Sequence, residues 1–114
     1  MPLPKIIQQQ VEKKLRKFCE SSVPSSIRDK VRVGLRFRGN SVTLYEGPPS
    51  FVDSSVWIDI VVAQFRFDQA SRRWILYCAD RNSRWHEHLD SEPTHNFELL
   101  LREVDEDPTG IFSG

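Results

Sequence analysis

The chain has 114 residues, of which 39% are hydrophobic and 11% aromatic, and its formal net charge is +0 at pH 7. This length allows one domain that folds without disulfides or a structural metal, and no apolar run approaches the roughly 20 residues that cross a bilayer. We therefore expect a single domain over residues 1–114 that makes no membrane contact and is located in the cytoplasm.

The first expected element is a helix over about residues 4–20, with Pro4 at its entrance. Its apolar stripe is formed by Ile7, Val11, Leu15 and Phe18, which recur at the spacing of one helix face. Pro24 disfavours helical backbone at the residue before it, so the helix is expected to end upstream of that point.

A β-hairpin is predicted because two alternating runs, about residues 31–38 and 41–46, flank the two-residue turn Gly39-Asn40. The expected cross-strand pairs are Arg38 with Ser41, Phe37 with Val42, and Leu35 with Leu44. These pairs place the apolar residues on one face. The opposite face then carries Arg32, Arg36, Arg38, Thr43 and Tyr45.

Three further strands are expected at about residues 56–67, 73–79 and 84–89. The first alternates between two sides that are both apolar, which is typical of a strand inside a sheet. One side carries Trp57, Val61, Ala63, Phe65 and Phe67, and Trp74 and Trp85 continue it on the next strands. The other side carries Ile58, Ile60, Val62, Gln64 and Arg66, continued by Ile75 and Tyr77.

The last helix is expected over about residues 94–106, capped by Thr94, and residues 107–114 form a turn and tail. Its buried stripe is Phe97, Leu100, Leu101 and Val104. The fold class is therefore α+β: a helix, an antiparallel meander of about five strands and a second helix. We expect both helices on the sheet face that bears Phe37, Phe65, Phe67, Trp74 and Trp85, and one helix on each face is the alternative.

Four segments of the chain carry a resemblance to a known family: RGNSVTLYE, VAQFRF, WILYCADRNSRWH and the carboxyl-terminal EVDEDPTGIF. With these segments the chain, from about Cys19 to Phe112, resembles the bacterial family called domain of unknown function three-zero-two-four. The ending DPTGIF after a helix is the most specific part. The resemblance implies a bacterial source and transfers no activity and no catalytic residue.

The residues themselves predict no catalytic group and no cofactor. There is no Gly-x-Ser-x-Gly elbow, and Cys19 and Cys78 fit reduced buried thiols rather than a disulfide framework. His86 and His88 point to one face of a strand and are the metal alternative, which a small metal-dependent enzyme would use. They lack the spacing of a recognised metal motif, so no metal site is predicted.

The remaining signals favour a non-enzymatic binding or interaction module. Apolar side chains that alternate away from the aromatic face predict an interface with a second copy or another protein, formed by Ile58, Ile60, Val62, Ile75 and Tyr77. Nucleic-acid binding is the alternative, through the interleaved cations and ring of Arg32, Arg36, Arg38, Tyr45 and Arg66. Because the net charge is zero, we rank nucleic-acid binding below the protein interface.

Overall fold

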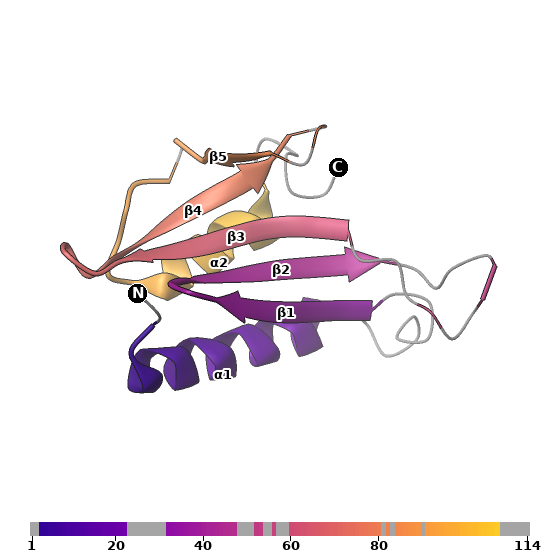
Figure 1. The fold of residues 1–114 in the computed structure, drawn as a ribbon, viewed down its shortest axis with the longest axis horizontal. Coiled ribbons are helices and arrows are strands. Elements are labelled where there is room, and N and C mark those ends of the chain that lie inside the picture. The colour runs from indigo at the N-terminus through magenta and orange to yellow at the C-terminus, as the bar shows by residue number, and fades with distance from the viewer. Residues whose placement is uncertain are drawn as a thin grey trace.

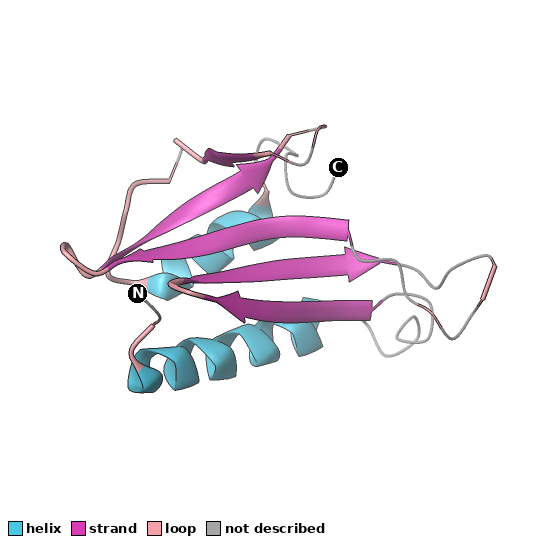
Figure 2. Ribbon diagram, in the orientation of Figure 1, coloured by secondary structure: helices cyan, strands magenta, loops and turns pink. Residues whose placement is uncertain are grey.

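The computed structural model describes residues 3–22, 32–47, 52–53, 56, 60–80, 82, 84–89 and 91–107. The elements are α1 (Lys5–Ser22), β1 (Arg32–Arg38), β2 (Ser41–Gly47), β3 (Ile60–Asp68), β4 (Arg73–Ala79), β5 (Trp85–Glu87) and α2 (Phe97–Glu106). The strands form one antiparallel sheet in the order β1-β2-β3-β4-β5, a meander that Figure 1 shows with its helices. Figure 2 marks the same helices and strands by colour. The predicted α+β class, with a helix before and after the sheet, is confirmed.

The first hairpin has the register that the sequence predicts. Arg38 lies opposite Ser41, and the next pairs inward are Phe37 with Val42 and Leu35 with Leu44. Gly39 has a φ of 57°, a left-handed conformation that suits the first central position of a tight hairpin turn. Asn40 then ties this turn to β3, because its side-chain amide donates to the Phe67 carbonyl and its own carbonyl accepts from the Phe67 amide, at 2.8 and 2.9 Å.

The pairing of β2 with β3 contains a β-bulge between Leu44 and Tyr45. Leu44 lies opposite Ala63, whereas Tyr45 lies opposite Val61, so Val62 is the extra residue of β3. A shift of one residue transfers the side chains beyond it to the other face of a sheet. Val61 therefore shares the face of Tyr45, and the predicted alternation of β3 is wrong at its amino-terminal end.

Both helices cover the same face of the sheet, as Figure 1 shows. The buried residues of the helices and strands form one core cluster: Leu3, Val11, Leu15, Val42, Leu44, Ala63, Phe65, Phe67, Trp74, Leu76, Cys78, Phe97, Leu100, Leu101 and Val104. Phe97 of α2 is the link between layers, with its ring centroid 4.8 Å from that of Phe65 and 5.0 Å from that of Trp74. The expectation that the helices pack together on the aromatic face is confirmed for the described residues.

Trp85 is an exception to that expectation. It lies opposite Ala79, and Glu87 lies opposite Tyr77, so Trp85 shares the sheet face that points away from the helices. The prediction that Trp85 lies on the sheet face covered by the helices is wrong. The buried residue at this edge is His88, which follows β5 and is 5% exposed.

The second helix begins later than its sequence signals indicate. Its cap is Asn96, whose side chain accepts from the Glu98 amide at 3.1 Å. Thr94 instead forms a backbone bridge with Trp74, which holds the segment before the helix against β4. The helix ends at Glu106, and Asp107 follows with a φ of 44° and an amide that donates to the Glu103 carbonyl. Apart from Asp107, the turn and tail expected over residues 107–114 lie outside the described residues.

Replacing either ring of the central aromatic cluster should destabilise the fold strongly. Phe65 and Trp74 are 0% and 4% exposed, and we expect Phe65→Ala and Trp74→Ala each to lower the free energy of unfolding by about 3–5 kcal/mol. The matched control is Ile6→Ala, because Ile6 is 66% exposed on α1, and its effect should stay within about 0.5 kcal/mol. Denaturant melts measure all three, and losses below about 1 kcal/mol for both ring variants would contradict this core.

Candidate functional site

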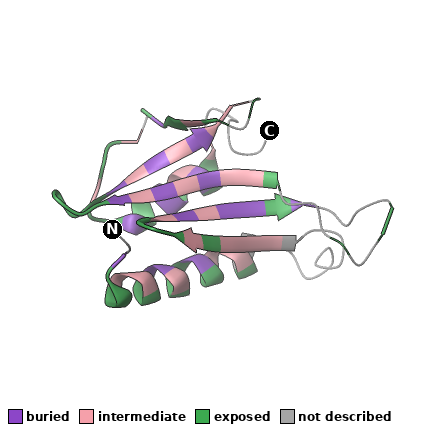
Figure 3. Cartoon of the chain, viewed as in Figure 1, coloured by how far each residue is buried: buried purple, intermediate pink, exposed green. Residues whose placement is uncertain are grey.

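The candidate site is the outer face, the side of the sheet that points away from α1 and α2. The register assigns to it Gly34, Arg36, Arg38, Ser41, Thr43, Tyr45, Gly47, Val61, Gln64, Arg66, Asp68, Arg73, Ile75, Tyr77, Ala79, Trp85 and Glu87. Figure 3 shows this face toward the viewer, with exposed and half-buried positions alternating with buried ones along the strands. Within the described part of the chain, no helix covers it.

A polar chain crosses the outer face from β2 to β4. The Gln64 amide donates to Thr43 Oγ1 at 3.0 Å, and Arg66 Nε donates to Gln64 Oε1 at 2.6 Å. The Arg66 guanidinium in turn lies over the Tyr77 ring, with Cζ 3.8 Å from the ring centroid. A guanidinium over an aromatic face is attracted by the ring quadrupole. Arg66 is therefore held in one orientation from two directions.

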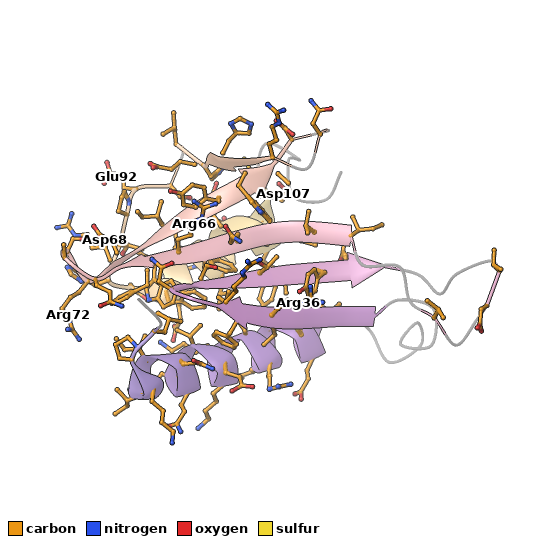
Figure 4. The ribbon with its side chains drawn as sticks, in the orientation of Figure 1. Arg36, Arg66, Asp68, Arg72, Glu92 and Asp107 are labelled. Atoms are coloured by element: carbon orange, nitrogen blue, oxygen red, sulfur yellow. The ribbon has the colours of Figure 1, made fainter. Side chains whose placement is uncertain are left out.

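A second arginine over a tyrosine ring lies at the β1 side of the outer face. Arg36 Cζ is 5.1 Å from the centroid of Tyr45, whose strand β2 pairs directly with β1. Figure 4 labels Arg36 and Arg66 and shows them on the same side of the sheet. Arg36 is exposed and Arg66 is half-buried, so both remain accessible to a ligand.

The outer face is locally cationic although the chain as a whole is neutral. Among the described residues, no carboxylate forms an ion pair with Arg36, Arg38 or Arg66. The register also places Arg32 on the outer face, opposite Gly47, but the Arg32 side chain is not among those that the structure describes.

The structure does not bring the predicted apolar interface together. Ile60 lies opposite Glu46 in the row of Val33, on the helix side of the sheet, and Val62 packs against the core. The bulge is the physical reason, because it removes these side chains from the face on which strict alternation would place them. Ile75 and Tyr77 do lie on the outer face, and Ile58 lies outside the described residues.

The histidines of the metal alternative bind different carboxylates. His86 Nε2 donates to Asp80 Oδ2 at 2.7 Å, and the buried His88 donates through Nε2 to Glu103 of α2 at 3.2 Å. The Arg84 backbone amide, and after it the His86 imidazole, lowers the pKa of the Asp80 carboxyl. No group of three or more His, Cys, Asp or Glu that could hold a metal ion occurs among the described residues. The geometry thus assigns these histidines to the anchoring of the β5 edge.

Sequence reasoning assigns two members of the outer face, Val61 and Trp85, to the other face, Val61 because of the bulge. It gives Gln64 the correct side but does not identify it as the bridge between Thr43 and Arg66. The signal for this bridge is a polar residue at the centre of a mainly apolar strand. Trp85 was assigned to the other face, and its short strand contains too few residues for alternation to decide.

The two cysteines are free thiols in this structure, Cys78 buried and Cys19 half-buried. Burial raises the pKa of the Cys19 thiol to about 11 and also raises that of Cys78. Because the thiolate is the nucleophilic form, neither thiol is activated at neutral pH.

Alkylation of Cys19 should therefore be slow until the pH becomes strongly alkaline. With a pKa raised from 9.0 to about 11, the thiolate fraction at pH 8 is about a hundredfold below that of the unperturbed thiol. Mass spectrometry after iodoacetamide treatment measures this, with the chain unfolded in guanidinium as the control. Equal rates for the folded and unfolded chain at pH 8 would contradict a buried, protonated Cys19.

The geometry defines the class of protein as a two-layer α+β domain in which no described element covers the sheet face that carries two arginines over tyrosine rings. The chain belongs to the family described as domain of unknown function DUF3024, whose family model matches residues 3–114. This confirms the family resemblance carried by the four sequence segments. Neither a curated protein nor a solved structure matches the chain. None of the described helices has the length and apolar character that a membrane crossing requires.

Proposed function

We propose that this protein is a non-enzymatic binding module whose outer face binds single-stranded nucleic acid. One observation carries the proposal: the Arg66 guanidinium lies over Tyr77 and is fixed by Gln64, with Arg36 over Tyr45 on the same face. The sequence favours a protein interface over nucleic-acid binding, and the bulge leads us to the opposite order. It breaks the apolar patch that favoured a protein interface and leaves the arginines and tyrosines together.

The chemistry of a single strand matches these groups. A guanidinium that lies on a tyrosine ring keeps N–H groups at its edge for phosphate oxygens, and the free face of its plane can stack on bases. Arg36 and Arg66 lie on strands two positions apart in the sheet, a separation of about 10 Å. A strand of nucleic acid that crosses the sheet can contact both. We further propose a cytoplasmic location, which the two free cysteines support.

Binding should depend on salt and on the two stacked arginines. A fluorescently labelled single strand of thymidine or uridine should bind the wild-type protein at about 50 mM salt and weaken steeply toward 200 mM. Arg36→Ala and Arg66→Ala should each lower affinity and reduce the salt slope by about one. Fluorescence anisotropy measures both quantities.

Arg102→Ala is the matched control for this experiment, because Arg102 is an exposed arginine of α2, on the opposite side of the sheet. Its affinity should equal that of the wild type. Absence of binding at low salt, or an equal loss in Arg102→Ala, would contradict the proposed face.

The second candidate is a protein partner or a second copy on the same face. It is favoured by Ile75, Tyr77 and Trp85, which are half-buried, point away from the core and lie under no described element. Such side chains gain free energy when a partner covers them, although association entropy consumes part of the gain.

Self-association is tested by Ile75→Asp. If a second copy covers the outer face, light scattering should show a concentration-dependent dimer that this variant converts to a folded monomer. Ile6→Asp, an exposed change on α1, should leave the dimer intact. A wild-type chain that stays monomeric at high concentration would remove this candidate and leave the nucleic-acid proposal unaffected.

A further inference from the structure

The outer edge of β1, the first strand of the sheet, pairs with no described strand. On its other side β1 pairs with β2. Its closing pair, Arg38 with Ser41, is the hydrogen-bonded pair of a two-residue hairpin. The alternation of backbone directions is supported by the Asn40 carbonyl, which accepts from the Phe67 amide and so points toward β3 rather than toward β1. The N–H and C=O groups of Val33, Leu35 and Phe37 therefore point outward from the sheet edge.

A groove lies beside this edge. It has a volume of about 400 Å³ and is lined by Arg16, Cys19, Glu20, Val33, Gly34 and Leu35. Its two walls are β1 and the second half of α1, which run alongside each other in Figure 1. Because burial keeps the Cys19 thiol protonated, Cys19 acts as an apolar wall residue. The edge and the groove together have the form of a site for an extended peptide.

We propose that the β1 edge binds an extended segment of a partner protein by strand addition, and that this segment alternates acidic and apolar residues. The alternation follows from the two sides of β1. On the outer face, Arg36 and Arg38 are exposed and form no ion pair among the described residues, so they attract carboxylates. On the groove side, Val33, Leu35 and Phe37 are half-buried at the margin of the core, so they favour apolar side chains.

A second copy of β1 does not have the alternating acidic and apolar residues that the β1 edge favours. Antiparallel self-pairing about Leu35 would place Arg38 opposite Arg32 of the other copy, and like charges directly opposite each other destabilise a strand pair. Arginines on an edge strand also discourage self-association in general. The same charges admit an acidic strand. The edge therefore selects a partner with the opposite charge pattern.

The edge site is distinct from the proposed nucleic-acid site because it uses backbone groups and a groove rather than stacked rings. Gly34, Arg36 and Arg38 of β1 belong to both surfaces, whereas Arg66 belongs to the nucleic-acid site alone. Loss of Arg66 should weaken oligonucleotide binding and leave peptide binding unchanged, so the two proposals can fail separately.

The test uses the full chain and a capped ten-residue peptide of alternating Glu and Val. Backbone amide hydrogen exchange, followed by NMR, should show at least about tenfold stronger protection of Val33, Leu35 and Phe37 when the peptide saturates the protein. Gly34 and Arg36 should change little, since the hairpin register directs their amides toward β2. Peptide binding without protection at the three outward amides would overturn the proposal, as would no binding of this peptide at low salt.

Charge reversal supplies the second arm of the test. The double variant Arg36→Glu and Arg38→Glu should lose the Glu-Val peptide and bind a matched Lys-Val peptide instead. Arg73→Glu is the control, because Arg73 is an exposed arginine on β4, away from the β1 edge, and it should keep the wild-type preference. Equal binding of both peptides by the wild type would overturn the inferred charge pattern.

Discussion

The packing of Phe97 against Phe65 and Trp74 is the contact on which the rest of the structure depends. Phe97 opens α2, and its ring lies about 5 Å from rings on two neighbouring strands. This contact places α2 on the same sheet face as Val11 and Leu15 of α1. Because both helices cover one face, no described element covers the other face, and no described strand pairs with the outer edge of β1. The candidate binding surfaces are thus a consequence of one-sided packing.

The bulge in β3 decides the chemical character of the uncovered face. Without the extra residue Val62, strict alternation would place Val62 and Ile60 on the same face as Ile75, and that face would gain apolar area of the kind found at protein interfaces. With it, Val62 packs on the core and Ile60 lies in the row of Val33. The face keeps its polar centre, in which Gln64 positions Arg66 over Tyr77. An extra residue in one strand therefore removes two apolar side chains from this face and leaves its arginines and polar centre in place.

Arginines serve different roles at the two proposed surfaces. On the outer face, Arg66 is oriented by a ring and an amide, which would reduce the entropy lost on binding a phosphate in the proposed site. At the β1 edge, Arg36 and Arg38 are exposed at the margin of the sheet, where in our proposal they select among strands by charge. Both proposals assign an acidic ligand to a chain whose net charge is zero. Local placement of charge, rather than its total, determines what such a sheet can bind.

The sequence by itself determined the features that depend on neighbouring residues. The register of the first hairpin follows from a two-residue turn between alternating strands, and the buried stripe of α2 follows from helical spacing. The α+β class follows from the order of these local elements. The contact between the Arg66 side chain and the Tyr77 ring could also be predicted, since the sequence puts both residues on one side of adjacent strands.

Only the tertiary structure decided the features that depend on contacts between distant segments. The bulge arises from the pairing of β2 with β3, which no local pattern encodes, and it relocates Ile60 and Val62. Thr94 and Asn96 both have capping side chains, and the bridge of Thr94 to Trp74 leaves the cap to Asn96. The face of Trp85 is set by its register against β4, because a three-residue strand is too short for its own alternation to decide. Local periodicity specifies elements, and the register between elements specifies the surface that they present.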